Sequence, residues 1–567
     1  MICAIFQKLQ LTTIAPSVML GSVDTSWIHY LKHEVACMKK PKRISILEPG
    51  TLILGVLLSI LSAAICMQIM GQLGTAPNTS LIGAVLVMII ARIPLAVAQK
   101  FRNLERQNYV LSIASSAGFS AANCGFVAIA TMFILGRHDM IVPIALGTLV
   151  GCMIAVFVMG RIFDSKIFPA QGPWPMGQAV VSVVEAGDSG GKKGFELLQG
   201  LVVGAIAGFF GVPMAGVGIA FVANMVTMTA LGVGIIVRGY GPRVFGGFDI
   251  GQTNIAQGLM IGAGAVALVQ IIITISKSSK HKSAPHHVED GNKTAPAGGD
   301  APYTVSDAAT QRTLVGSVGL FAAGGIALAL LTGIFSDMTP LMSVAWVVFS
   351  GVVSVVVMVL VGTASMHSGW APGFAVITIF LTLGMLIGFP AIPLAVLIGY
   401  VGAVGMPMHD TGIGLKAGWL LRGKGADPAA EAYGRRQQVL IKQIGVVVGI
   451  LMAMIFGLVL IRGDVIPPMS IFYAATIGEA VNPALLRELA MWAVPGAVLQ
   501  AAFDNKSVGL MVATGLLINN PIFGVTLLVA IALRKVIGVK HMSIRAPGLI
   551  AGDGLFGFVS NIVRAFF

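Results

Sequence analysis

Charged side chains are scarce in this sequence of 567 residues. Asp, Glu, Lys and Arg make up 10% of the chain, whereas roughly a quarter is usual for a soluble domain. Apolar residues make up 56%. A soluble chain of this composition could not cover its core with polar surface, so the surplus of apolar side chains must face lipid. The composition therefore excludes an ordinary soluble globular protein.

The sequence also lacks the patterns of common enzymes and metal sites. Its five cysteines form no CxxC pair and no metal-ligand spacing, so we expect neither disulfides nor a metal centre. There is no Walker lysine motif, no HExxH and no GxSxG elbow. We therefore expect no cofactor, no enzymatic activity and no ATP hydrolysis by this chain alone.

Long apolar runs are what the sequence has in abundance. A hydrocarbon layer about 30 Å thick requires roughly 20 apolar residues in a helix. We expect an all-α, polytopic transmembrane bundle of about 15–16 segments, in which the short segments between 489 and 518 are broken or re-entrant. The expected segments are 50–70, 79–97, 109–135, 140–160, 197–212, 215–237, 254–275, 313–335, 340–362, 372–388, 391–405, 444–461, 489–502, 507–518, 521–537 and 546–563.

The chain divides into four parts by composition. Residues 1–47 form an N-terminal cytoplasmic extension, in which Met38 precedes a basic stretch and is the expected initiator, so that 1–37 stand outside the native chain. Residues 48–275 form a first transmembrane half, 276–311 a polar linker, and 312–567 a second transmembrane half. Seven spans before the linker would place its lysines outside, so we expect a further crossing or re-entrant segment around 238–253. Short echoes between the halves hint at an internal repeat but differ in offset.

The formal net charge of +13 does not indicate nucleic acid. Lys and Arg cluster in the loops between apolar runs, as the positive-inside rule predicts for cytoplasmic loops. We expect a multi-pass protein of an inner membrane, in contact with the lipid bilayer and with no nucleic-acid partner. The sequence leaves a homo-oligomer open.

A Pro-rich stretch at 172–187 is the first candidate for a site. Prolines here break a helix and leave backbone carbonyls free, and Trp174 and Gln178 add an indole and an amide. Glu185 follows as a candidate for proton or cation coupling. The alternative is a cytoplasmic turn with Glu185 solvated near two lysines.

The densest polar group beside apolar sequence lies at 405–418. His409, Asp410 and Lys416 could form a proton relay. Asp410 and Lys416 are not spaced as an i,i+4 pair, so the spacing does not assure a direct contact between them. The alternative is a helix start in which Asp410 is the N-cap.

Three further polar positions are weaker candidates. His367 lies in a turn between two apolar runs and could line a cavity or satisfy a helix end. Asn224 lies within an apolar run, where an amide more often bonds a neighbouring helix than a ligand. Asp553, flanked by two glycines, is a better candidate for a buried carboxylate than Asp504.

Taken in order, these stretches resemble the oligopeptide transporter superfamily, whose bacterial members are relatives of the yellow-stripe-like metal-chelate transporters. The resemblance covers nearly the whole chain from about residue 45. It is carried by Glu105–Gly118, Trp174–Gly187, Gly362–Gly373, Asp410–Gly418 with Arg435–Gln438, and Gly548–Gly554. Met176 stands where the family's Pro-x-Pro-Glu-Gly element has Glu, and His367 begins a departure from the family's usual Asn-Asn-Pro turn.

The resemblance implies a bacterial secondary transporter that carries a short oligopeptide or peptide-like solute across the membrane by symport with protons. We therefore expect broken helices at 172–187 and 405–418 to line one midplane cavity. The expected coupling residues are Glu185, Asp410 and Asp553; the expected solute contacts are Trp174, Gln178, His367, His409 and Lys416. Transport of a metal chelate, a membrane-embedded enzyme using His409 and Asp410, and an ion channel remain as alternatives.

Overall fold

The computed structural model describes most of the chain from residue 48 onward. The predictions for the N-terminal extension, the segment at 79–97 and Asp504 lie outside the described residues. So does most of the predicted polar linker, although α13 reaches Lys280 and α14 begins at Asp307. The described residues are 48–74, 103–188, 191–244, 246–280, 303–369, 371, 373–478, 483–503, 508–539, 542 and 544–566.

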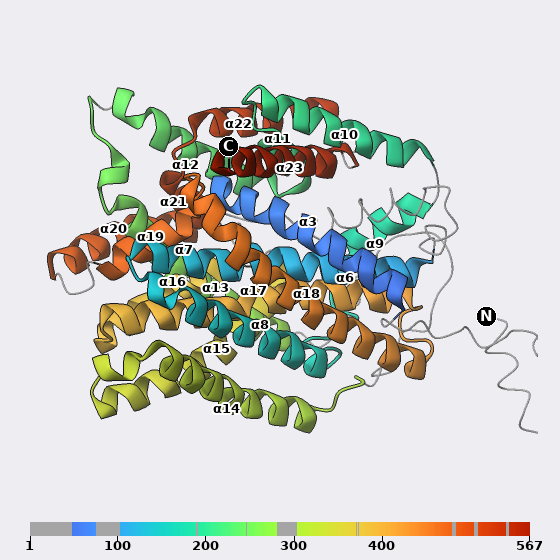
Figure 1. Cartoon of the computed structure of the whole chain (residues 1–567), viewed down its shortest axis with the longest axis horizontal. Coiled ribbons are helices and arrows are strands. Elements are labelled where there is room, and N and C mark those ends of the chain that lie inside the picture. Colours follow the sequence, from blue (N-terminus) through green and yellow to red (C-terminus); the bar gives the residue numbers. More distant parts are fainter. Residues whose placement is uncertain are drawn as a thin grey trace, which may run out of the picture. The chain divides into compact units, whose positions relative to one another are not determined.

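The described residues form helices, with one isolated β-bridge between Phe163 and Phe168 and no strand. The predicted all-α transmembrane bundle is therefore confirmed (Figure 1). The helices in chain order are α3 (Pro49–Leu73), α6 (Leu104–Phe119), the π-helix η2 (Ser120–Phe126), α7 (Val127–Ile134), η3 (His138–Met140), α8 (Ile141–Ile162), α9 (Pro175–Asp188), α10 (Gly191–Phe209), α11 (Met214–Val222), α12 (Met225–Val244), η4 (Ile250–Gln252), α13 (Ile255–Lys280), α14 (Asp307–Thr332), η5 (Ile334–Asp337), α15 (Pro340–Ser368), α16 (Gly373–Ile387), α17 (Ala391–Leu421), α18 (Pro428–Arg462), α19 (Pro468–Gly478), α20 (Pro483–Ala501), α21 (Val508–Leu517), α22 (Pro521–Ile537) and α23 (Arg545–Phe566).

Seven stretches of helix in the described residues are long and apolar enough to cross a membrane by length and composition. Large apolar side chains such as Leu341 and Leu330 are exposed on the outer helices, at 82% and 67%. Exposure of this kind is costly in water and favourable in lipid. The chain is a multi-pass membrane protein. The seven stretches are Pro49–Gln72, Leu104–Ile134, His138–Ile162, Asp307–Thr332, Pro340–His367, Ala391–Leu421 and Pro428–Arg462.

Local sequence explains where several helices begin and end. α18 starts at Pro428, whose missing N–H costs nothing in the first turn, and the Asp427 side chain accepts from the next two free backbone N–H groups. α15 starts in the same way at Pro340 after Thr339. It ends at Gly369, whose φ of +72° is the left-handed conformation that glycine adopts without strain.

The predicted break at 405–418 is wrong, because α17 runs without interruption from Ala391 to Leu421. Pro407 lies inside this helix and leaves the carbonyl of Ala403 without its usual donor. The thiol of Cys152 on α8 donates to that carbonyl at 3.2 Å. A neighbouring helix thus satisfies the freed backbone group, which is how membrane helices tolerate an internal proline.

Two other expectations about segments also differ from the structure. The crossing suspected around 238–253 is absent from the described residues there: α12 ends at Val244, and Ile250–Gln252 is a short 3₁₀ turn. The segment expected at 215–237 is divided into α11 and α12. Asn224 lies at the division and accepts from the N–H groups of Val226 and Thr227, so it caps α12 and does not bond a neighbouring helix.

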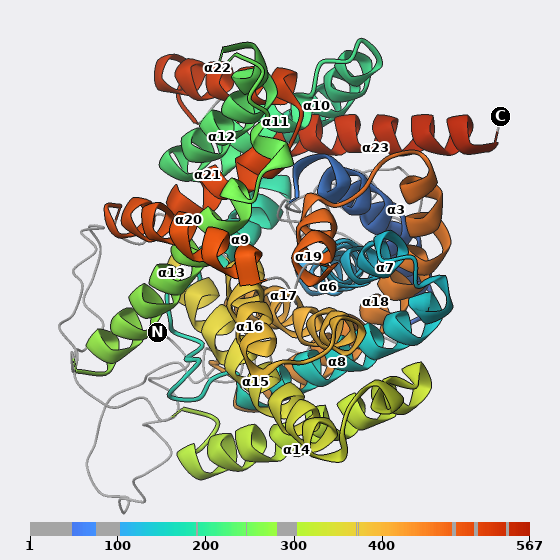
Figure 2. The same cartoon turned by 90° about the vertical axis from the view of Figure 1, so that its left-hand side faces the viewer.

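The helices gather around two main groups of buried apolar residues. One group contains α11, α12 and α22 with the facing sides of α3, α21 and α23. The larger group contains η2, α7 and α8 and most of α14–α19. In Figures 1 and 2, α10, α11, α12, α22 and α23 lie together on one side and α14 and α15 on the opposite side.

Close packing of α6 against α18 brings the polar centre together. Gly445 and Gly449 on α18 face the backbone of α6: an added Cβ at Gly445 would lie 2.5 Å from the Ile113 carbonyl oxygen, and one at Gly449 would collide with the Ala117 carbonyl oxygen. Small residues at this spacing let helix backbones approach in lipid, where apolar burial gives little drive for association.

Candidate functional site

A fully buried ion pair lies at the meeting point of three helices. Lys442 of α18 donates from Nζ to Oδ2 of Asp410 on α17 at 2.5 Å, and the two side chains are 0% and 1% exposed. Ser115 of α6 donates to the other carboxylate oxygen at 2.7 Å. The neighbouring Ser116 donates to the Lys442 carbonyl at 2.9 Å. Both carboxylate oxygens are therefore satisfied inside the bundle, as a buried charge requires.

Further hydrogen bonds lie between this pair and the end of the bundle. Gln438, one turn before Lys442 on α18, donates to Ser112 of α6 at 3.0 Å and accepts from Arg422 at 3.3 Å. Arg422 pairs with Glu431 at 2.7 Å, with side chains 6% and 3% exposed. The α6–α17–α18 interface thus carries a line of polar side chains from its buried centre to its basic end.

His409 lies beside Asp410 on α17 and is buried. Its Nδ1 is 2.7 Å from the hydroxyl of Ser365 near the end of α15. Its ring meets the edge of Phe119, the last residue of α6, at a centroid distance of 5.5 Å. His367, two residues after Ser365, is half-buried in the last turn of α15. The polar centre therefore extends from α6 and α18 to α15.

Lys416 holds the segment that leads into α9. Its Nζ donates to the carbonyls of Ala170 and Gly172 at 2.7 and 3.0 Å, and lies 4.6 Å from the ring centroid of Trp419. Lys416 also lines a cavity of about 410 Å³ together with Gln178. The free carbonyls expected from the Pro-rich stretch are thus present, but the lysine occupies them.

Trp174 and Gln178 differ in their surroundings. Trp174 is fully buried; its indole donates to the Pro169 carbonyl at 3.0 Å and its backbone N–H to Met366 at 2.9 Å. Gln178 is exposed and donates to the Pro173 carbonyl at 2.6 Å. Trp174 therefore fixes the segment before α9 to the end of α15, whereas Gln178 faces the cavity beside Lys416.

Asp553 lies at one end of the short helix α11. Its Oδ2 accepts from the backbone N–H of Ala215 in the first turn at 2.8 Å. Arg534 of α22 donates to the carbonyls of Ala220 and Ala223 at the other end, at 2.7 and 2.6 Å. A carboxylate at a helix N-terminus and a cation at its C-terminus both stabilise the helix dipole. This geometry favours a positioning role for Asp553.

We expect Asp553→Ala to lower the unfolding free energy by about 0.5–2 kcal/mol, because Ala removes the cap of α11. Asp553→Asn keeps an acceptor for the Ala215 N–H and should lose less. Thermal unfolding of the purified protein in detergent measures both changes. Equal losses in the two variants would contradict capping as the main role of this side chain.

The three carboxylates expected to share one chamber lie apart. Asp410 is at the α6–α17–α18 interface, Asp553 is at the start of α11, and Glu185 is exposed on α9. Asp410, His409 and Lys416 all lie on α17, but each has different partners: Lys442 and Ser115 for Asp410, Ser365 for His409, and backbone carbonyls for Lys416. The partner of Asp410 is Lys442, which sequence analysis missed because contact between α17 and α18 is not visible in residue spacing.

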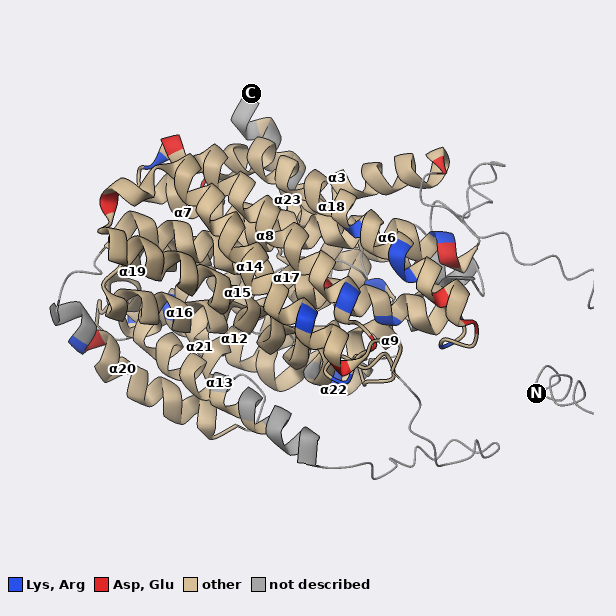
Figure 3. Cartoon of the chain, turned by 90° about the horizontal axis from the view of Figure 1, so that it is seen from below, with Lys and Arg blue, Asp and Glu red and all other residues tan. Residues whose placement is uncertain are grey.

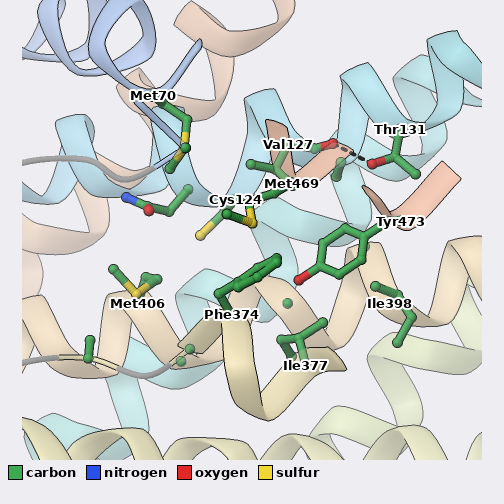
Figure 4. A pocket seen from close by; sticks show the side chains of 18 of the residues that line it. Met70, Cys124, Val127, Thr131, Phe374, Ile377, Ile398, Met406, Met469 and Tyr473 are labelled. Carbon is green, nitrogen blue, oxygen red and sulfur yellow. Dashed lines mark hydrogen bonds between the residues drawn. The ribbon is translucent and has the colours of Figure 1, made fainter. Parts of the chain in front are cut away.

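Sequence analysis also missed a cavity of about 100 Å³ one to three turns before His409 on α17 (Figure 4). Residues of α3, η2, α7, α15, α16, α17, α19 and α21 line it. A second cavity, of about 380 Å³, also contacts α3, α19 and α21 and is lined by apolar residues together with Arg238, Gln257 and Asn519. The π-helix at the first cavity is typical of functional sites, and Asn123 within an apolar run was its one sequence signal.

A helical bundle with internal cavities and a buried charged centre is typical of membrane transport proteins. Within that class, residues 50–276 match the family model described as OPT oligopeptide transporter protein. No curated protein matches the chain. The matched region includes Ser115 and Trp174, whereas Asp410 and Lys442 lie beyond it.

Proposed function

We propose that the protein is a secondary transporter that moves a short oligopeptide or peptide-like solute across the membrane together with protons. The match over residues 50–276 supports the solute class. The observation that supports the coupling is the buried pair of Asp410 and Lys442, with further polar side chains between it and one end of the bundle.

The chemistry of the pair suits a coupling site. Separating two opposite charges inside the bundle is costly, so the ionised pair holds α17 and α18 together. A proton that binds the Asp410 carboxylate removes the attraction and allows Lys442 to leave. Protonation would thus change which arrangement of α17 and α18 is favoured, and this is the requirement for coupling a proton to a conformational change.

The distribution of cations supports an orientation. Lys and Arg gather around the starts of α6 and α9 (Figure 3). The turn at the opposite end of α7 instead holds the ion pair Arg137–Asp139. By the positive-inside rule, the end with the excess of cations faces the cytoplasm. We accordingly assign the protein to the cytoplasmic membrane of a bacterium, in keeping with the bacterial relatives that its motifs resemble.

Uptake by proteoliposomes tests the proposed function. Reconstituted protein should accumulate a radiolabelled tripeptide when a proton gradient is imposed, and the peptide should be recovered unchanged. A chemically altered product would favour the enzyme alternative. Stronger competition by an iron chelate than by peptides would favour a metal-chelate transporter. Uptake that is identical with and without the gradient would exclude proton coupling.

We expect Asp410→Asn to lose gradient-driven accumulation while solute exchange between the two sides of the membrane continues. An amide cannot bind and release the proton, but the solute path remains. The double variant Asp410→Asn/Lys442→Met, which leaves no unpaired charge, should behave in the same way. Asp139→Asn, at the exposed pair with Arg137, serves as the control and should keep accumulation. Full accumulation by the double variant would rule out Asp410 as the coupling group.

A further inference from the structure

The cavity of about 100 Å³ has an unusual concentration of sulfur in its lining. Methionines spread over the sequence meet here from four helices, and a cysteine joins them from η2. Thioether side chains are flexible and polarizable, so they adapt to apolar groups of differing shape. The sulfur-bearing residues are Met70, Cys124, Met406, Met469 and Met511.

The polar groups of this cavity are few and mostly engaged. The hydroxyls of Thr131 and Thr514 donate to the carbonyls four residues before them, at 2.8 Å each. The ring of Tyr473 packs against Phe374 at a centroid distance of 5.6 Å, and its hydroxyl lies near Ile377 (Figure 4). That hydroxyl makes no hydrogen bond to a described residue. The cavity is therefore mainly apolar, with the Asn123 amide and the Tyr473 hydroxyl as its further polar groups.

A glycine of α17 keeps this cavity open. Around a Cβ added at Gly402, the nearest atom outside its own helix is Cγ1 of Ile377 at 4.0 Å. A larger side chain at this position would therefore extend into the cavity without a clash at its first carbon. Gly402 also lies seven residues before His409, about two turns along the same helix face.

The cavity shares helices with two other features of the bundle. A second cavity, which includes Arg238 and Gln257 in its lining, also contacts α3, α19 and α21. His409 and Asp410 follow it along α17. A solute side chain that enters this volume meets mainly apolar groups, which accept an apolar side chain and disfavour a charged one.

We propose that this cavity, defined by Cys124, Gly402 and Tyr473, is a subsite for one compact apolar side chain of the transported solute, aliphatic or thioether and of leucine or methionine size. The proposal rests on the proposed transport of a peptide-like solute. An engineered apolar cavity of roughly 150 Å³ holds benzene. A volume of about 100 Å³ therefore fits a branched aliphatic or thioether group and not an indole.

A first experiment tests the cavity without transport. A full-length protein that keeps Cys124 as its single cysteine should react with methyl methanethiosulfonate, and more slowly with the larger benzyl reagent or the charged sulfonatoethyl reagent. Gly402→Leu should slow the methyl reaction at least tenfold because its side chain fills the cavity; Gly402→Ala should have a smaller effect. Gly319→Leu, on the exposed face of α14, is the matched control and should not change the rate.

A second control uses Cys66 as the single cysteine. Its thiol is fully buried beside Ser62 and does not line the cavity, so it should stay unreacted. The proposal would be wrong if Gly402→Leu left the reaction rate of Cys124 unchanged. It would also be wrong if Cys124 reacted at the same rate with the methyl and the sulfonatoethyl reagents.

A second experiment tests the solute. Tripeptides Ala-X-Ala compete for uptake, with X as Gly, Val, Leu, Met or Trp. The Leu and Met peptides should bind roughly tenfold to a hundredfold more tightly than the Gly peptide, as burial of such a side chain implies. The Trp peptide should bind no more tightly than the Gly peptide, because an indole does not fit the cavity. Gly402→Leu should abolish the preference, and Gly319→Leu should keep it.

The two experiments separate the inference from the proposed function. If no tripeptide competes while the Cys124 reaction follows the expected pattern, peptide transport is wrong and the apolar cavity stands. If peptides compete with no dependence on X, transport stands and the subsite is wrong.

Discussion

Asp410→Asn is expected to lower the unfolding free energy by about 3–5 kcal/mol. The substitution leaves the Lys442 ammonium fully buried without its counter-ion, and breaking a buried pair by removing one partner costs this much. Ser115 remains as a partner for both groups, which places the loss toward the lower end of that range. Denaturant or thermal unfolding in detergent, followed by far-UV circular dichroism, measures the change.

The double variant shows whether the loss comes from the unpaired charge. Asp410→Asn/Lys442→Met replaces the pair with neutral side chains, so most of the lost stability should return. The exposed pair of Arg137 and Asp139 gives the control, because Asp139→Asn there should have no measurable effect. If the double variant were as unstable as Asp410→Asn, the cost would arise from packing at this interface.

Gly449→Leu is expected to have the second large effect, a loss of more than about 3 kcal/mol or a failure to fold. Overpacking in a tightly packed core typically costs 1–3 kcal/mol when side chains can shift. Here the added atoms would meet the backbone carbonyl of Ala117 and the hydroxyl of Ser120, and the backbone has less freedom to move. Separation of α6 from α18 would also pull Ser115 and Ser116 away from their partners.

Two further variants show whether the close approach of α6 and α18 causes this loss of stability. Gly449→Ala adds only the Cβ and should give an intermediate loss of stability. Gly319→Leu adds the same side chain at an exposed position of α14 with open space around it. We expect near-native thermal stability for Gly319→Leu. A comparable loss there would mean that leucine harms any transmembrane glycine position, and that close approach of α6 and α18 is not the cause.

Composition and apolar run length were sufficient to predict the helical membrane fold. The start of α15 at Pro340 was also predicted, but this helix runs six residues beyond the expected end at 362, and α18 begins sixteen residues before the expected start at 444. The continuity of α17 could not be predicted. Pro407 ends a helix unless another group satisfies the freed carbonyl, and here that group is the thiol of Cys152, about 250 residues away in sequence.

The site was predictable to a similar extent. Asp410, His409 and Lys416 stood out as polar residues beside apolar sequence, and all three are buried. Their partners did not stand out. Lys442 lies outside the expected membrane segments, two residues before the one at 444–461, and Ser115 and Ser365 are common residues in a helix. Which side chains meet depends on how helices pack, and one sequence contains no signal for the pairing of α6, α15, α17 and α18.

The π-helix between α6 and α7 has a consequence for how the bundle can move. Ser115 on one side of it contacts Asp410, and Val127 and Thr131 on the other side line the sulfur-rich cavity. An α-helix turns by about 100° per residue, so the gain or loss of one residue in this wide turn would rotate α7 relative to α6 by about that angle. α7 would then present a different face to the cavity, while Ser115 on α6 still contacted Asp410.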